Sequence, residues 1–308
     1  MRVLVTGITG AIGGGLAPRL LAGGHEVRGF TRGGHPSALE HIPGGVRIFT
    51  GDAISGEGLL PALRGVDVAY YLIHSMEPGA EEGFGVRERR AAANFAAVAA
   101  SAGVSRIVYL GGLVPEGSAS EHLTSRLAVE RILLEAIPDS VALRASIVIG
   151  ARSRSFRLLV RLIERMPVLI IPAWRDNRTA PVDERDVLSC LSRAATAPEV
   201  AGRSLDVAGP EVVTYGELID RIREQMLLDR PALNLPRLSL TPIASRVSAV
   251  VAGEEHALIG PLMHGLETDL LPRSGLATEV LGVRTHSLDA AIERALRDWE
   301  LTEHLRAR

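Results

Sequence analysis

The stretch Val3-Leu4-Val5-Thr6-Gly7-Ile8-Thr9-Gly10-Ala11-Ile12-Gly13 decides the fold of this chain. It predicts a buried strand, a glycine turn and the start of a helix. Gly7 permits the tight turn, Gly10 lets the backbone approach a diphosphate, and Gly13 lets the helix pack closely against the sheet. The helix would then direct unpaired N–H groups and its positive dipole end at the phosphates. An ordinary glycine-rich turn is the alternative, but the flanking apolar strand and helix favour a dinucleotide site.

The composition limits the classes of protein to which the chain can belong. Its 308 residues suffice for one large or two modest domains, and 46% of them are hydrophobic. A net charge of −2 gives no reason to expect nucleic acid or an anionic membrane as a partner. No apolar run reaches the roughly 18 residues of a membrane helix, and the single cysteine, Cys190, cannot form an internal disulfide. The chain enters a strand at once without a leader pattern, so we expect a cytoplasmic protein.

All 34 basic residues are arginines, and the chain contains no lysine. This excludes a Schiff-base lysine, a Walker-A lysine and a lysine general base. The nine histidines do not cluster at ligand spacing, so we expect no metal site. A nucleophile elbow of the form Gly-x-Ser-x-Gly is also absent from the sequence.

Strand and helix patterns alternate through the first half of the chain. Apolar segments predict strands over residues 26–30, 46–49, 66–73, 106–110 and 141–149, and long helices over 84–102 and 121–136. Such alternation is typical of a parallel sheet with right-handed crossovers. The predicted fold class is therefore α/β, a Rossmann-type doubly wound parallel sheet with a smaller, mostly helical substrate lobe.

The predicted domains divide at about the middle of the chain. Residues 1–150 form the dinucleotide-binding Rossmann domain, and residues 151–308 form a mixed segment that completes the sheet and builds the smaller lobe. Within the second segment, 181–183 and 204–207 predict strands that return to the sheet, and 184–197 predicts a helix between them. Thr214, followed by Glu217 three residues later, predicts the capped start of another helix.

Residues at strand ends are candidates for cofactor contacts, because ligands bind beyond the carboxyl ends of strands in such sheets. Arg32 suits the 2′-phosphate of NADP, and a solvated surface arginine is the alternative. Asp52 either accepts a hydrogen bond from the adenine amine or caps a turn. His74 and Ser75 contact the ribose or the diphosphate, or His74 is an ordinary loop histidine. The predicted NADP-binding residues are Gly7, Thr9, Gly10, Ala11, Ile12, Gly13, Arg32, Asp52, Ala53, His74, Ser75 and Gly111.

Several segments resemble the extended and atypical short-chain dehydrogenases/reductases, including the NmrA-like NAD(P)H-binding proteins. They are the glycine fingerprint at 6–13 and the segments 69–76 (AYYLIHSM), 94–97 (NFAA), 106–113 (RIVYLGGL), 122–126 (HLTSR) and 261–266 (PLMHGL). Together they extend over nearly the full chain. The resemblance implies a Rossmann fold that binds NAD(P)H, and it says little about the reaction.

The chain departs from this superfamily at the usual catalytic residues. Members of the superfamily carry a Ser or Thr after the fifth strand and a Tyr-x-x-x-Lys on the next helix, where the lysine lowers the pKa of the tyrosine. Here Gly111 and Gly112 stand in place of the serine, and His122 and Arg126 in place of the tyrosine and lysine. None of the four tyrosines has a lysine four residues later, which excludes the usual chemistry.

His122 and Arg126 are the predicted catalytic pair, because residues four apart share one face of a helix. A histidine of near-neutral pKa donates or accepts a proton without help from a lysine. An adjacent arginine favours the neutral imidazole and can bond to the nicotinamide ribose, as the lysine of the superfamily does. A surface histidine, or a cofactor-binding protein without turnover, remains an alternative interpretation.

The segments after the later strands are expected to line a substrate pocket, with Ser153, Phe156, Trp174 and Arg178. The arginines suit a carboxylate or phosphate substrate, or they form a solvated face. We therefore expect an NADP(H)-dependent oxidoreductase that acts on a small organic carbonyl, enone or quinone-like substrate by hydride transfer. A catalytically inactive NADP(H)-binding sensor, or a structural cofactor-binding subunit, is the alternative. A homodimer through the helices at 84–102 and 121–136 is expected by analogy alone.

Overall fold

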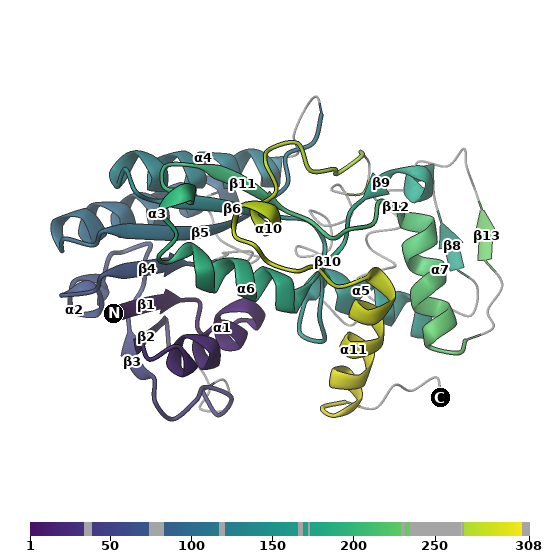
Figure 1. Ribbon diagram of the computed structural model, residues 1–308, viewed down its shortest axis with the longest axis horizontal. Helices are drawn as coiled ribbons and strands as arrows, with labels where there is room; N and C mark the ends of the chain where they lie inside the picture. Colours follow the sequence, from purple (N-terminus) through teal and green to yellow (C-terminus); the bar gives the residue numbers. More distant parts are fainter. Residues whose placement is uncertain are drawn as a thin grey trace.

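Seven parallel strands form the main sheet of the described chain, in the order β11-β6-β5-β4-β1-β2-β3 (Figure 1). Their bounds are β1 (Arg2–Thr6), β2 (Glu26–Thr31), β3 (Arg47–Thr50), β4 (Val68–Tyr71), β5 (Arg106–Gly112), β6 (Val141–Ala145) and β11 (Ser204–Val207). Strands β1 to β6 have the order of a Rossmann sheet: β1, β2 and β3 extend to one side, and β4, β5 and β6 extend to the other. The order of the strands therefore reverses between β1 and β4. This arrangement confirms the predicted α/β fold class.

The structure is a computed structural model of the whole chain. It describes residues 1–33, 39–73, 83–116, 121–165, 169–171, 173–228, 232–234, 266 and 268–303. Two predicted cofactor residues, His74 and Ser75, lie outside the described residues. His122 belongs to a described helix, but its side chain is not described.

Helices cover both faces of the sheet. Val3 and Val5 pack in the core shared with α1 (Ala11–Ala22) and α6 (Glu184–Ala194). Leu4 points to the other face, whose core is shared with α2 (Leu59–Leu63), α3 (Phe84–Ser101) and α4 (Glu121–Ala136). Because successive side chains of a strand point to opposite faces, a strand buried on both faces is a continuous apolar run.

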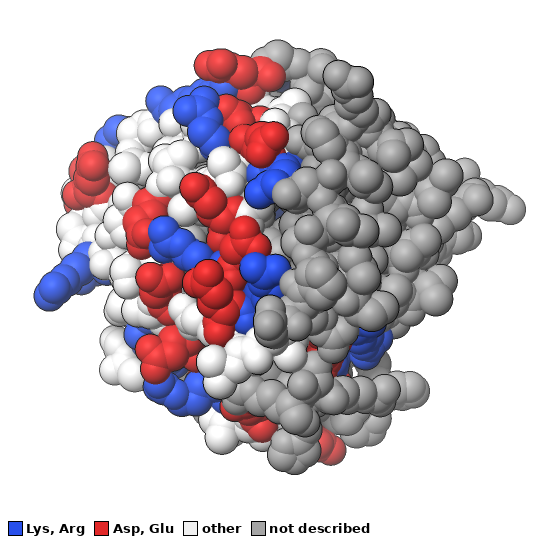
Figure 2. All heavy atoms as spheres, turned by 90° about the vertical axis from the view of Figure 1, so that its right-hand side faces the viewer, with Lys and Arg blue, Asp and Glu red and all other residues white. Residues whose placement is uncertain are grey.

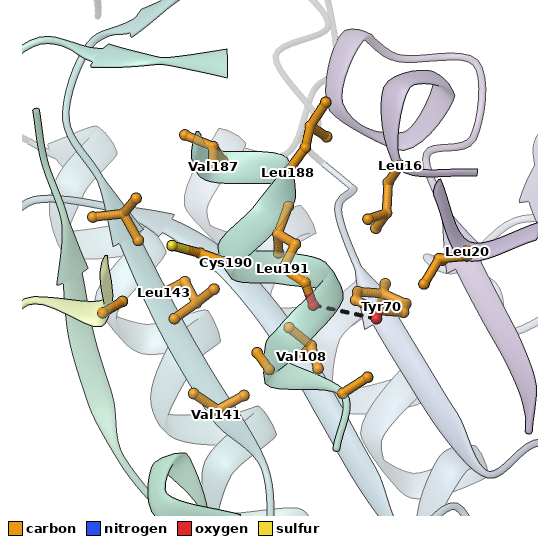
Figure 3. Packing of buried hydrophobic residues seen from close by; sticks show 14 of the residues in the cluster. Leu16, Leu20, Tyr70, Val108, Val141, Leu143, Val187, Leu188, Cys190 and Leu191 are labelled. Atoms are coloured by element: carbon orange, nitrogen blue, oxygen red, sulfur yellow. Dashed lines mark hydrogen bonds between the residues drawn. The ribbon is translucent and has the colours of Figure 1, made fainter. Parts of the chain in front are cut away.

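The helix α6 brings the second half of the chain onto the sheet that the first half builds (Figure 3). Its buried side chains pack in a core with residues of α1 and of the main sheet. The labelled members of this core are Leu16, Leu20, Tyr70, Val108, Val141, Leu143, Val187, Leu188, Cys190 and Leu191. At the centre, the Tyr70 hydroxyl donates to the carbonyl oxygen of Leu191 at 3.3 Å. Burial raises the pKa of Tyr70, so the hydroxyl keeps its proton and remains a donor.

The structure corrects two strand predictions. The segment 141–149 is not one strand, because the chain leaves the main sheet after Ala145 and continues as β7 (Val148–Ile149). The segment 181–183 does not return to the main sheet either: its strand, β10 (Val182–Asp183), pairs with β7 in a separate two-stranded sheet. The backbone hydrogen bonds change partner at this point, since Ser146 N donates to Val207 O at 3.0 Å and Val182 N donates to Ile147 O at 2.9 Å.

A smaller helical lobe lies beyond the main sheet, on the right of Figure 1. Its core is formed by α5 (Arg154–Arg165), α7 (Tyr215–Gln225) and α11 (Leu288–Glu300) around the buried Trp299. The remaining short elements are β8 (Leu169–Ile171), η2 (Ala173–Asp176), β9 (Arg178–Thr179), η3 (Pro198–Val200), β12 (Val213–Thr214), β13 (Ala232–Asn234) and α10 (Ala277–Val280). The predicted cap of α7 is confirmed: Glu217 N donates to Thr214 Oγ1 at 3.1 Å, and Thr214 N donates to Glu217 Oε2 at 2.7 Å.

Arginines on the protein surface are interspersed with acidic side chains. Figure 2 shows both signs mixed over the described part of one face. Arginines of the described chain form ion pairs with acidic residues, among them Arg221 with Glu211 at 2.8 Å and Arg297 with Glu293 at 2.6 Å. Among the described helices, none is long and apolar enough to cross a membrane.

We expect Leu191→Ala to lower the free energy of unfolding by about 2–5 kcal/mol, because the substitution empties part of the core between α6 and the sheet. The matched control is Leu60→Ala on α2, where the side chain is 48% exposed. Urea denaturation followed by circular dichroism measures both variants. A loss at position 191 no larger than the loss at position 60 would contradict the packing of α6 described above.

Candidate functional site

A cavity of about 450 Å³ opens beyond the carboxyl ends of β1, β2 and β4. The floor is fixed by Thr6, whose hydroxyl donates to Tyr70 O at 3.0 Å and accepts from Leu72 N at 2.9 Å. The cavity therefore lies at the point where the strand order reverses, which is where ligands bind in open α/β sheets. The predicted site residues that line it are Gly7, Thr9, Gly10, Ala11, Ile12, Gly13, Arg32, Asp52, Ala53, Arg126 and Ser153.

The glycine turn forms a cradle that side chains would fill. Gly7 has a φ of +63°, and a Cβ there would lie 2.8 Å from the carbonyl oxygen of Leu72. A Cβ on Gly13 would lie only 2.4 Å from the carbonyl oxygen of Gly7, so α1 packs directly on the turn. Gly10 precedes α1 and offers no side chain to cap it, which leaves N–H groups of the first helical turn for a ligand. These features fit the diphosphate of a dinucleotide.

The loop after β3 forms a second wall of the cavity. Asp52 Oδ1 accepts a hydrogen bond from Ile54 N at 2.8 Å. Asp52 therefore caps the turn after β3, which is one of the two roles expected for it from the sequence. Asn94 of α3 holds the same loop by donating to Ala53 O at 3.2 Å and to Ile54 O at 2.8 Å. Arg32 follows β2 and lies at the rim beside this loop, with an exposed side chain.

Arg126 of α4 reaches the cavity from the side of β5. Its Nη2 donates to Leu110 O at 2.5 Å, and its Cζ lies 5.7 Å from the centre of the Tyr109 ring. The Tyr109 hydroxyl donates to the Arg126 carbonyl oxygen at 3.3 Å. Burial raises the pKa of Tyr109 to about 12, so this phenol is neutral at physiological pH.

Gly111 and Ser125 have packing contacts near the same helix. A Cβ on Gly111 would lie 3.1 Å from Cε1 of Tyr109, so the glycine makes room for the ring that supports Arg126. Gly111 is not among the described residues that line the cavity. Ser125 Oγ donates to Glu88 Oε2 at 2.8 Å in a buried contact between α4 and α3. This contact fixes the helix that carries His122 and Arg126.

The four predicted substrate residues do not lie together. Ser153 lines the cavity, whereas Phe156, Trp174 and Arg178 are not among its described lining residues. Phe156 is fully buried in the core of the smaller lobe. Trp174 stacks edge-on against Tyr215, with ring centres 6.1 Å apart. Arg178 is exposed and binds Asp269 through its Nε at 2.9 Å and its Nη2 at 2.7 Å.

Three charged residues that line the cavity, Arg152, Arg154 and Glu184, were not among the predicted site residues. Arg152 donates from Nη2 to Thr9 O at 3.1 Å, and Glu184 begins α6. Arg152 follows β7, and Glu184 follows β10. Both therefore lie at the carboxyl end of a strand, the same position that made Asp52 a candidate for a ligand contact. They were missed because β7 was not separated from the strand before it, and because the strand at 181–183 was expected to return to the main sheet. Within the described residues, no group of three or more His, Cys, Asp or Glu side chains is placed to hold a metal ion.

Comparison with known proteins agrees with this geometry. Residues 7–135 match a family model described as NAD(P)H-binding. The (4-alkanoyl-5-oxo-2,5-dihydrofuran-3-yl)methyl phosphate reductase of Streptomyces griseus is 31% identical over 222 residues, which cover 70% of each chain. The 2-alkyl-3-oxoalkanoate reductase of Shewanella oneidensis is 24% identical over 257 residues, which cover 71% of this chain and 64% of that protein.

Solved structures share the fold. The UDP-glucuronic acid 4-epimerase of Bacillus cereus, in complex with UDP-glucuronic acid and NAD, superposes with a TM-score of 0.72 at 17% identity. The match covers 97% of this chain and 98% of the epimerase chain. The chain belongs to this NAD(P)H-binding family, and it shares the fold of the epimerase. This is an oxidoreductase-type family, and reductases are among the relatives of this chain.

We expect Gly13→Ala to lower the affinity for NAD(P)H by about tenfold or more, because the added methyl group forces α1 away from the turn. Gly44→Ala is the control, since a Cβ at Gly44 meets no atom within 4 Å. Fluorescence titration with the reduced nucleotide measures binding, and circular dichroism verifies that both variants fold. A folded Gly13→Ala protein with unchanged affinity would show that the close approach of α1 is not needed.

Proposed function

We propose that the protein is an NADP(H)-dependent oxidoreductase that acts on a small carbonyl, enone or quinone-like substrate carrying an anionic group. The observation that carries this proposal is one cavity that joins the glycine cradle, the Arg32 rim and the Arg126 guanidinium. The names of the two reductase relatives support the substrate class, since both describe a carbonyl compound that bears a phosphate or a carboxylate.

The residues of this chain have separate roles in the proposed reaction. The glycine turn and the start of α1 hold the diphosphate, and Arg32 holds the 2′-phosphate, which is absent from NAD. When bound, the nicotinamide supplies or accepts the hydride. The protein must therefore provide a proton donor or acceptor for the substrate oxygen and a positive charge to orient the substrate.

His122 and Arg126 are the proposed groups for these two tasks. They lie one helical turn apart on α4, and Arg126 is held at the cavity by its contacts with Leu110 and Tyr109. In the proposed reaction the imidazole of His122 accepts or returns a proton near neutral pH, as an ordinary histidine can. Arg126 orients either the ribose or an anionic substrate through paired N–H donors.

A second candidate function is an NADP(H)-binding sensor or a structural cofactor-binding subunit without turnover. The observation in its favour is the replacement of the usual serine, tyrosine and lysine by Gly111, His122 and Arg126. Tyr109 does not restore the missing acid, because its hydroxyl is bonded to the Arg126 carbonyl and its pKa is raised by burial. The two functions share the cofactor site and differ only in turnover.

We expect Arg32→Ala to weaken NADPH binding by about tenfold or more and to leave NADH binding unchanged, because only NADPH carries the 2′-phosphate. Calorimetric titration with each nucleotide tests this selectivity. The control is Arg64→Ala, an exposed arginine that is not among the described residues lining the cavity. Equal losses for the two nucleotides would count against the 2′-phosphate contact, and no binding of either would remove the oxidoreductase proposal.

We expect His122→Ala to lower kcat by about 10²–10⁴-fold, the range typical of a lost general acid or base. The assay follows NADPH absorbance over a panel of 3-oxoacids, enones and quinones. His41→Ala is the control, because His41 is exposed and is not among the described residues of the cavity. Unchanged turnover would remove His122 from the mechanism, and tight NADPH binding without turnover of any substrate would favour the sensor.

A further inference from the structure

Two of the charged residues that line the cavity lie on the side built by β7 and β10. Arg152 lies in the loop between β7 and α5, and Glu184 is the first residue of α6. Both follow the pair β7–β10, the small sheet that branches from the end of the main sheet. A further wall of the cavity, distinct from the loop after β3, is therefore built by residues that lie far from the glycine turn in sequence.

The guanidinium of Arg152 lies across the start of α1. Its Nη2 donates to Thr9 O at 3.1 Å, and its Nη1 lies 3.1 Å from the position that a Cβ would take on Gly14. A side chain at position 14 would press on the guanidinium, so the glycine there leaves room for this close approach. Arg152 is exposed and forms no close ion pair within the described part of the chain. Arginine has five N–H donors in a planar fork that suits phosphate oxygens, so donors remain for a ligand.

Glu184 places a carboxyl group on the same side of the cavity. A Cβ on Gly150 would lie 2.0 Å from Glu184 Oε2, and a Cβ on Gly15 would lie 3.5 Å from Oε1. The glycine at position 150 therefore leaves the room that the carboxyl group occupies between β7 and α1.

The charges around this carboxyl group come from three further elements. Burial is the largest effect and raises the pKa of Glu184 to about 7. Arg152 opposes the rise, Asp183 of β10 and Asp298 of α11 add to it, and Arg294 of α11 opposes it. Glu184 thus changes its charge in the range of physiological pH.

We propose that Arg152 binds the diphosphate of NAD(P)H together with the start of α1, and that Glu184 couples this binding to the uptake of one proton. The proposal rests on the cofactor site of the proposed function. A helix N-terminus supplies only about half a positive charge, whereas the diphosphate carries two negative charges, so a full positive charge beside the helix strengthens binding. The added negative charge near Glu184 disfavours its carboxylate form.

The sign of the pH dependence follows from this repulsion. Below about pH 7 the carboxyl group is already protonated, and binding requires no further proton. Above that pH the group is ionised in the free protein and takes up a proton when the diphosphate binds. The affinity therefore falls as pH rises above about 7, by at most tenfold per pH unit for one proton.

Calorimetric titration of NADPH and of NADH, without substrate, tests the role of Arg152. We expect Arg152→Gln to weaken binding of both nucleotides by about tenfold or more, since both carry the diphosphate. Arg152→Lys retains part of the affinity because it keeps the charge but not the fork. Arg131→Gln on α4 is the matched control at an exposed position that is not among the described residues of the cavity. The loss for both nucleotides separates this role from that of Arg32.

Titrations in two buffers of different ionisation enthalpy, at about pH 6 and about pH 8.5, test the role of Glu184. We expect the wild type to take up close to one proton at the higher pH, and Glu184→Gln to take up none and to bind with little dependence on pH. Glu199→Gln, at an exposed position of η3, is the control and should behave as the wild type.

Each outcome decides the proposal. Wild-type affinity in a folded Arg152→Gln protein would overturn the diphosphate contact and leave Arg152 available for the phosphate or carboxylate of a substrate. Proton uptake that persists in Glu184→Gln would overturn the coupling. In both cases the wild type still binds the nucleotide, so the proposed function stands. Failure of the wild type to bind either nucleotide would overturn both proposals together.

Discussion

The packing of α1 against the turn that follows β1 is the constraint on which the rest of the molecule depends. At Gly13 no side chain can come between the helix and the carbonyl oxygen of Gly7, because a Cβ would lie 2.4 Å from it. The approach aims the start of α1 at the cavity and positions its apolar face, Leu16 and Leu20, over the sheet. One steric condition thus serves both the core and the cofactor site, which explains why the motif is so informative in the sequence.

The same site is completed by distant parts of the chain, each held by its own contacts. Asn94 holds the loop after β3, Tyr109 and Leu110 hold Arg126, and the β7–β10 pair carries Arg152 and Glu184 to the opposite wall. In a site built from several supporting elements, the residues that face the substrate can be replaced while the glycine turn that holds the cofactor is kept. The replacement of the usual tyrosine and lysine fits such a change, because the contacts that support Arg126 involve backbone carbonyls and an aromatic ring.

The sequence predicted the main sheet well because parallel strands are buried on both faces and appear as apolar runs. It predicted the glycine cradle and the cap at Thr214 because both depend on local residues. It could not show the break after Ala145, since this depends on hydrogen bonds from distant backbone at Val207 and Val182. For the same reason it missed Arg152 and Glu184, and it selected Phe156, which the structure places inside the core of the smaller lobe.

The bond from Tyr70 to Leu191 joins the two halves of the sequence across the core, and it bears on how the chain unfolds. The side chains of α6 cover the face of β4, β5 and β6 that residues 1–150 leave open. A boundary at residue 150 therefore does not separate folding units, and it does not divide the cavity either, because Arg152, Ser153 and Glu184 line it together with the glycine turn. A fragment that ends there would expose a broad apolar sheet face and be prone to self-association. We expect the sheet and α6 to melt in one cooperative transition, with the cofactor site lost in the same step.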